Sequence, residues 1–168
     1  LKVWLRILSA ASHHPTLQDR IELLFPQVLA HGTYLEHFTS FGPDTRNHLL
    51  TELCARLHFR YIFEGLSPPL SLTELESRLL TQIEKQFWND GSPGEGSINY
   101  HLFVVESIYE LYLHALSRRP DFAVTLHEAM SPLVRFTMAV VCDNGHWPTI
   151  GDTDGGMGSG LFCFQECT

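Results

Sequence analysis

The stretch DGSPGEGSINYH, residues 90–101, lies between two long amphipathic segments that have the pattern of scaffold. Its glycines and Pro93 cannot continue a helix, because glycine is entropically costly there and proline lacks the amide hydrogen. Ser97 then offers a side-chain oxygen of the kind that caps a helix start, so Tyr100 and His101 fall in the first turn of the next helix. A phenol and an imidazole beside a glycine-rich loop at a helix start are candidates for an acid/base pair.

Apolar residues on both sides of this stretch recur at helical spacing, and no convincing strand pattern precedes the last few residues. We therefore predict an all-α fold of about six helices in antiparallel hairpins packed side by side, forming one domain over residues 1–168. Gly/Asp-rich residues 147–168 form an irregular tail. The predicted helical segments are 1–11, a second from about residue 16 that Pro26 kinks or splits, a short one at 32–40, and then 45–63, 72–87, 98–117 and 122–141.

Composition narrows the class of protein. With 168 residues, of which 44% are hydrophobic, the chain can bury a core of its own. The net charge of -8 argues against broad nucleic-acid binding, which needs a basic face. No apolar run is long enough to span a bilayer, and residues 1–4 do not read as a signal peptide. Because the chain begins on an already amphipathic stretch, we expect it to be a fragment or a processed chain.

Three segments, in this order, resemble motifs of the heparinase II/III family of polysaccharide lyases. Residues 47–53 (NHLLTEL) are similar to that family's NNHL…E segment, and residues 90–101 to its DG…E.S..YH segment. Residues 143–156 are similar to its DG..P.iGD.D.G loop. Order and separations fit from about residue 40 onward. The resemblance implies that the helices form part of an (α/α) toroid and that the activity is β-elimination of an acidic polysaccharide.

Matching motif positions imply catalytic roles for Asn47, His48 and Tyr100. Asn47 and His48 would neutralise the carboxylate of a uronic acid, because the proton at C5 becomes acidic only when the enolate-like charge is stabilised. Tyr100 would take that proton, protonate the leaving glycosidic oxygen, or do both in a syn elimination. A tyrosine in either role needs a cationic or hydrogen-bonded setting, because its ordinary pKa is about 10.

Other residues are candidates for substrate binding. Glu52 stands one helical turn beyond His48 and could orient its imidazole. Arg46 could meet a substrate carboxylate or sulfate, and an exposed indole could stack on a pyranose ring. The full set of substrate-binding candidates is Glu52, Arg46, His101, Trp88, Trp147 and Asp152. We expect neither a metal nor another cofactor in this chain.

The chain also departs from the family pattern. Arg46 stands where the family has its first Asn, and the bulky pair His146-Trp147 stands where smaller residues are expected. Family enzymes carry a β-sandwich domain after these motifs, so we expect a C-terminal β-sandwich to be missing and the fragment to be inactive alone. We also expect a periplasmic or secreted location, with the signal not present in this chain.

Two alternatives stay open. A glycoside hydrolase on a similar helical toroid, acting on uronyl oligosaccharides, would need two carboxylates across the scissile bond. Glu95 with Asp152 or Asp154 could supply them. A non-catalytic carbohydrate-binding helical protein would retain Trp88 and Trp147 but tolerate loss of Tyr100. The polymer is not determined by the sequence, although the shortage of Lys and Arg near the motifs disfavours a heavily sulfated one.

Overall fold

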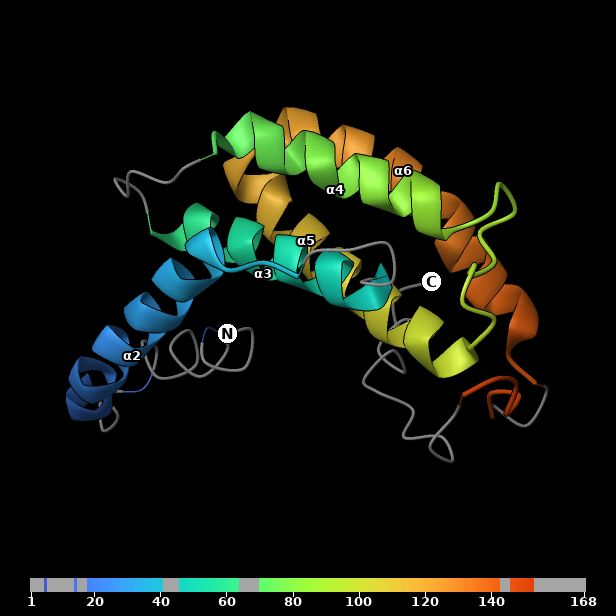
Figure 1. Ribbon diagram of the computed structural model, residues 1–168, viewed down its shortest axis with the longest axis horizontal. Helices are drawn as coiled ribbons and strands as arrows, with labels where there is room; N and C mark the ends of the chain where they lie inside the picture. The colour runs from blue at the N-terminus through green and yellow to red at the C-terminus, as the bar shows by residue number, and fades with distance from the viewer. Residues whose placement is uncertain are drawn as a thin grey trace.

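The computed structural model describes residues 5, 14, 18–40, 46–63, 70–142 and 146–152, and these ranges contain helices and loops. The described helices are α2 (Gln18–His37), α3 (Arg46–Ile62), α4 (Leu72–Gln86), α5 (Ile98–Arg118) and α6 (Pro120–Val140) (Figure 1). The helix predicted for residues 1–11 lies outside the described residues, apart from the buried Leu5. The fold is all-α, as the hydrophobic periodicity predicted.

Helix α2 is one continuous helix of 20 residues that runs through Pro26. The prediction of a separate short helix at 32–40 is therefore wrong. Gly32 has a different role, since a Cβ built on it would come within 2.2 Å of the ring of Phe59 in α3. The missing side chain lets the two helices approach closely, a use of glycine that the local sequence does not distinguish from a helix break.

The predicted helix starts agree with the structure where the chain is described. Ser71 and Glu74 form a complete capping box before α4, in which each side chain accepts from the backbone amide of the other residue. Ser97 caps α5, because its hydroxyl oxygen accepts from the amide of Tyr100. Helix α3 begins and ends within one residue of its predicted bounds.

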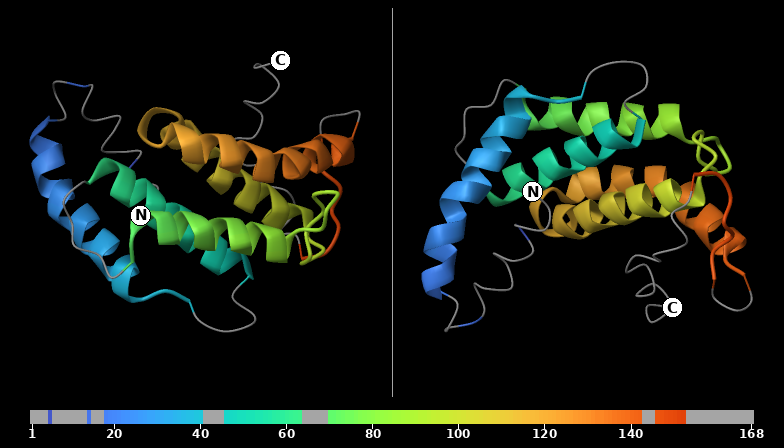
Figure 2. Two further views of the ribbon diagram at one scale, coloured as in Figure 1. Left: turned by 90° about the horizontal axis from the view of Figure 1, so that it is seen from above. Right: turned by 60° about the horizontal axis from the view of Figure 1, so that its bottom comes forward.

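The helices form two antiparallel hairpins, α3–α4 and α5–α6, that lie side by side (Figures 1 and 2). Helix α3 packs against α5 and runs in the same direction, and α4 packs against α6. One layer is thus made of α3 and α5 and the other of α4 and α6. This two-layered arrangement is that of part of an (α/α) toroid, as predicted.

The main hydrophobic core fills the space between these two layers. Every one of the four helices contributes fully buried side chains: Leu50, Leu53 and Leu57 from α3, Leu75 and Leu79 from α4, Ile108 and Leu111 from α5, and Leu126 and Leu133 from α6. Tyr61 of α3 also lies in this core. Ile62, the last residue of α3, is 41% exposed and lies outside it.

A buried ionic cluster joins α2 to α3. Glu36 accepts hydrogen bonds from Arg56 Nη2 at 2.8 Å and from Arg60 Nε at 2.8 Å. All three side chains are at most 7% exposed. Burial alone would raise the pKa of Glu36. The hydrogen bonds that the two arginines donate, together with their positive charges, have the larger effect and lower that pKa below its ordinary value.

A second set of polar contacts lies where α3 and α5 end and α4 begins. Tyr61 donates its hydroxyl hydrogen to Glu76 at 3.1 Å, and Arg119 donates to the same carboxylate at 2.9 Å. Burial raises the pKa of Glu76, although Arg119 and Tyr61 oppose the rise. His58 and His114 meet through their Nδ1 atoms, 3.0 Å apart. These contacts tie the C-terminal halves of α3 and α5 together.

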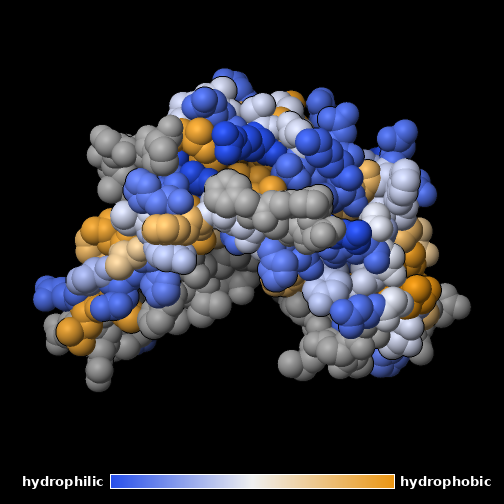
Figure 3. Space-filling view, viewed as in Figure 1, coloured by the Kyte–Doolittle hydropathy of each residue, from blue (hydrophilic) through white to orange (hydrophobic). Residues whose placement is uncertain are grey.

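The surface differs between α2 and the layer that contains α4. Figure 3 shows mostly hydrophilic residues along the upper edge of the molecule and a mixture of hydrophobic and hydrophilic residues over α2. Leu23 and Phe25 on α2, and Phe38 directly after it, are exposed. No helix in the described part of the chain is both long enough and apolar enough to cross a membrane.

Candidate functional site

The two predicted catalytic segments lie at the same end of the molecule. Asn47 and His48 occupy the first turn of α3, and Tyr100 occupies the first turn of α5. Because the two helices pack side by side in the same direction, their first turns share the right-hand end in Figure 1. The contact between His58 and His114, near the opposite ends of these helices, supports the same orientation.

Tyr100 presents its phenol at the surface of this end. Its side chain is 38% exposed, and its hydroxyl donates to Asp152 Oδ2 at 3.4 Å, a long hydrogen bond. The Tyr100 backbone amide donates to the Ser97 hydroxyl oxygen, which fixes the first turn. The phenol is therefore accessible and already faces a carboxylate.

The loop that carries Asp152 is docked onto the start of α5. The Ile98 amide donates to the carbonyl oxygen of Ile150 at 3.4 Å, and the Ser97 hydroxyl donates to the carbonyl oxygen of Asp152 at 2.7 Å. Gly151 has a φ of +77°, and a Cβ there would lie 2.4 Å from the carbonyl oxygen of Gly96. Only glycine fits both that backbone angle and that gap, so the sequence of this loop sets where Asp152 lies.

Asn47 and His48 have side chains that other described groups leave unused. Asn47 is only 8% exposed, and His48 is exposed. Among the residues that the structure describes, neither side chain has a hydrogen bond or an ion pair. The start of α3 thus offers an amide and an imidazole to a ligand.

The comparisons with known proteins bear directly on these segments. The family model described as heparinase II/III N-terminus matches residues 10–158. The chain belongs to the heparinase II/III family. No curated protein and no solved structure matches it. The family implies a polysaccharide as the class of substrate, and the matched region includes all the residues that the motif resemblance selected.

Glu52 does not contact His48, the residue that we expected it to orient. Its carboxylate accepts from the Ser40 hydroxyl at 2.5 Å and from the Ser40 amide at 2.7 Å. No hydrogen bond joins Glu52 to His48 in the described part of the chain. Glu52 therefore fastens the segment after α2 to α3, and its predicted role of orienting the imidazole is not supported.

His101 cannot touch a substrate in this structure. It is 1% exposed, and its ring lies between those of Phe87 and Phe136. The Thr137 hydroxyl donates to the Leu133 carbonyl, so it can only accept from His101 Nε2, 2.8 Å away. Burial lowers the pKa of His101 to about 4, although a backbone hydrogen bond with Leu133 opposes the fall. The prediction of a substrate-binding role for His101 is corrected: it joins α5 to α6.

The remaining candidates separate into exposed and packed residues. Trp147 is half-buried against a small cluster that contains Ile98 and Leu102, so it anchors the docked loop. Trp88 is 69% exposed in the loop between α4 and α5, and Arg46 is exposed at the start of α3. Glu95, a carboxylate of the hydrolase alternative, is half-buried. Asp154 and residues 143–145 of the third motif lie outside the described residues.

Sequence reasoning missed two features of the site. Ser97 was expected to cap α5, but its hydroxyl also donates to the Asp152 carbonyl and so holds the loop. Gly151 was read as part of a motif, whereas its contact with Gly96 shows why a larger residue would push the loop away. The Gly151-Asp152 pair could have suggested a tight turn from the sequence alone, but the close approach of Gly151 to Gly96 could not be found locally. Within the described ranges, no group of three or more His, Cys, Asp or Glu residues could hold a metal ion.

Proposed function

We propose that this chain carries part of the active site of a polysaccharide lyase that cleaves an acidic, uronic-acid-containing polysaccharide by β-elimination. The observation that carries the proposal is the accessible Tyr100 phenol, which faces Asp152 at the start of α5. The start of α3, with Asn47 and His48, lies at the same end of the molecule.

Asn47 and His48 neutralise the carboxylate of the sugar. The side-chain amide of Asn47 donates to one carboxylate oxygen, and the imidazole of His48 donates to the other. As the C5 proton leaves, negative charge spreads onto these oxygens, and donors already aimed at them stabilise it. Among the described residues neither side chain has another partner, which supports this role, because no hydrogen bond to a described residue has to be broken first.

Tyr100 carries the proton transfers. The C5–H bond breaks, its electron pair becomes the C4–C5 double bond, and the bond from C4 to the glycosidic oxygen breaks. Tyr100 takes the C5 proton, gives a proton to the departing oxygen, or does both in turn on one face of the ring. The products are an unsaturated uronate and a shortened chain with a free hydroxyl, and no water is consumed.

Asp152 orients the Tyr100 hydroxyl. A carboxylate that accepts from the phenol fixes the direction of the O–H bond and restricts rotation of the hydroxyl hydrogen. The 3.4 Å distance is long, and such contacts often tighten when a substrate excludes water from a site. Asp152 therefore acts through Tyr100 in this proposal, and Arg46 contributes charge for the anionic polymer.

The wider setting follows from the substrate. Acidic polysaccharides are components of matrices and cell envelopes, so we place the protein in the periplasm or outside the cell. In the intact enzyme, we expect a C-terminal β-sandwich domain to complete the site.

The test is Tyr100→Phe in the intact enzyme, followed by the ultraviolet absorbance of the unsaturated uronate. We expect a loss of activity of roughly 10²- to 10⁴-fold with unchanged stability, because one oxygen of an exposed phenol is removed. Tyr112→Phe is the matched control, since Tyr112 lies on the same helix and packs against the core. Activity close to wild type in Tyr100→Phe would remove Tyr100 from the mechanism. Products that gain water and no double bond would indicate a hydrolase.

A further inference from the structure

The Ser97 hydroxyl lies between the backbones of the two residues whose side chains meet in the candidate site. It donates to the Asp152 carbonyl oxygen at 2.7 Å, and its oxygen accepts from the Tyr100 amide at 3.4 Å. Tyr100 and Asp152 are 52 residues apart in the sequence, and the phenol of one faces the carboxylate of the other. One hydroxyl therefore joins the two backbone segments that present this pair.

Ser97 itself is shielded from any substrate. It is 1% exposed, so its hydroxyl cannot reach a sugar. A serine hydroxyl has a single hydrogen to donate, and that hydrogen is used in the bond to the Asp152 carbonyl. An effect of Ser97 on chemistry must therefore pass through the positions of Tyr100 and Asp152.

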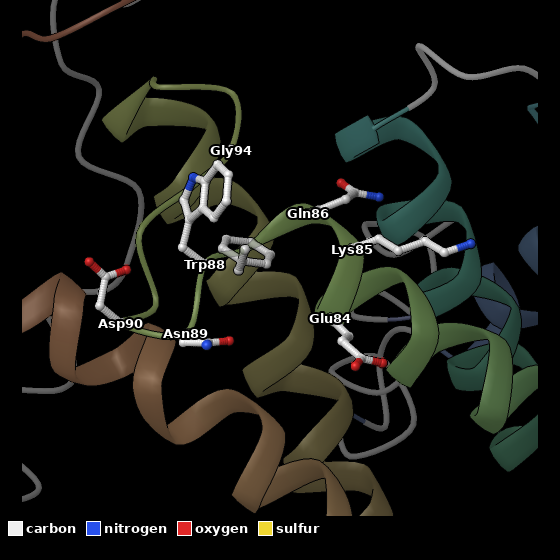
Figure 4. A pocket seen from close by; sticks show the side chains of 8 residues that line it. Glu84, Lys85, Gln86, Trp88, Asn89, Asp90 and Gly94 are labelled. Carbon is white, nitrogen blue, oxygen red and sulfur yellow. The ribbon is translucent and has the colours of Figure 1, made fainter.

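The loop that leads into Ser97 is fastened on two sides. The Gly94 amide donates to the Gln86 carbonyl at 2.8 Å, which closes the loop against the end of α4 (Figure 4). Gly91 lies so close to α6 that a Cβ on it would stand 2.0 Å from the Pro132 carbonyl oxygen. Ser97 therefore presents its hydroxyl from a position that the neighbouring helices determine.

The docked loop that carries Asp152 is attached to α5 along its length. Trp147 packs against a small apolar cluster that contains Ile98, and the Ile98 amide donates to the Ile150 carbonyl at 3.4 Å. The bond from Ser97 is shorter, at 2.7 Å, and it falls on the backbone of Asp152 itself. Its loss would therefore be felt first at the residue whose carboxylate faces the phenol.

We propose that Ser97 is a positioning residue, whose hydroxyl places the Asp152 carboxylate against the Tyr100 phenol. The inference rests on the proposed function, in which Asp152 orients the Tyr100 hydroxyl. At 3.4 Å, the bond between phenol and carboxylate is already at the long end of the range for hydrogen bonds. A small shift of the Asp152 backbone is therefore enough to break it.

Helix capping alone predicts different effects, and a second capped helix in the same chain separates the two. Ser71 caps α4 as Ser97 caps α5, because its hydroxyl oxygen accepts from the Glu74 amide at 3.2 Å. Helix α4 runs antiparallel to α3, so Ser71 lies at the opposite end of the molecule from Tyr100 (Figure 1). Ser71→Ala thus removes a cap hydroxyl without touching the candidate site.

The experiment compares Ser97→Ala with Ser71→Ala in the intact enzyme, by the ultraviolet absorbance of the unsaturated uronate. We expect kcat of Ser97→Ala to fall roughly tenfold, with KM close to wild type because Ser97 touches no sugar. Ser71→Ala should change neither constant. Ser97→Thr keeps the hydroxyl at an extended backbone position that suits a β-branched residue, so it should restore most of kcat. Circular dichroism checks that each variant is folded.

The double variant Ser97→Ala/Asp152→Asn tests whether the two residues act through one contact. If they do, its activity should fall roughly tenfold rather than roughly hundredfold, because the second substitution removes a contact that is already lost. Losses that multiply would overturn the positioning role. Wild-type activity in folded Ser97→Ala would overturn it as well.

Amide hydrogen exchange over residues 146–152, measured without substrate, tests the hold on the loop apart from turnover. Exchange should be faster in Ser97→Ala than in wild type and Ser71→Ala, because the loop has lost its bond at Asp152. Unchanged exchange would overturn the inference even if the chain is a lyase. Faster exchange together with wild-type activity of Tyr100→Phe would overturn the proposed function and the positioning role that rests on it, but not the hold of Ser97 on the loop.

Discussion

The two ends of the layer formed by α3 and α5 use polar residues in opposite ways. Around the C-terminal half of α3, Glu36 lies buried against two arginines, and Tyr61 meets a buried Glu76. At the N-terminal end, Asn47 and His48 have no partner among described residues, and Tyr100 is accessible. The same two helices run through both ends, so secondary structure does not explain the difference.

The contrast indicates how stability and chemistry are separated in this chain. Polar groups that satisfy one another in the interior fix how the helices pack, but they are not available to a ligand. Polar groups at a helix start that have no partner among the described residues can meet a substrate. Substitutions at one end should therefore change the free energy of unfolding, and substitutions at the other should change activity.

Glu36→Gln should have the largest effect on stability. The amide removes the negative charge between Arg56 and Arg60 and leaves two buried guanidinium groups without a counter-ion. Removing one partner from a buried ion pair costs about 3–5 kcal/mol, measured here by urea unfolding. Glu22→Gln on the exposed side of the same helix should cost less than about 0.5 kcal/mol. A loss below about 1 kcal/mol at Glu36 would show that the cluster does not hold α2 in place.

The buried imidazole of His101 predicts a pH dependence of stability. Its pKa falls from 6.5 in the unfolded chain to about 4 in the folded protein. Above pH 6.5 the imidazole is neutral in both states. Below it, the unfolded chain binds the proton first, so the free energy of unfolding should decrease as the pH falls from about 6.5 to about 4.

At about 1.4 kcal/mol for each pH unit, His101 accounts for a decrease of about 3 kcal/mol across this window. Unfolding measured at several pH values for wild type and His101→Gln isolates this part, since the variant lacks the imidazole. His37→Gln, at an exposed position on α2, is the control. If the free energy of unfolding falls with pH in the same way for wild type and His101→Gln, protonation of the His101 imidazole does not cause the decrease.

Local sequence signals predicted the features that depend on neighbours along the chain. The Ser71–Glu74 capping box and the Ser97 cap involve residues three apart, so their pattern was readable before any fold was known. The helical spacing of apolar residues likewise indicated the all-α fold. Such patterns follow from helix geometry alone.

Features that depend on distant partners were beyond the same reasoning. Glu52 was paired with His48 because the two stand four apart on a helix, but Ser40 offers it both an amide and a hydroxyl. Helix geometry turns His101 by about 100° from Tyr100, but its contacts with Thr137 of α6 and with the ring of Phe87 needed the fold. The close approach of Gly32 to Phe59 needs two helices in place before it can be seen.

Asp152→Asn tests the end of the molecule that carries the first turns of α3 and α5, and it should cause the smallest change. The amide keeps an oxygen that accepts from the Tyr100 hydroxyl, but it removes the charge that makes this bond strong. We expect activity to fall roughly tenfold, about 1.4 kcal/mol, with a free energy of unfolding close to wild type, because the side chain is exposed. Asp121→Asn, on the exposed start of α6, should change neither quantity. A loss as large as that of Tyr100→Phe would mean that Asp152 takes part in proton transfer itself, and no loss would mean that the phenol needs no partner.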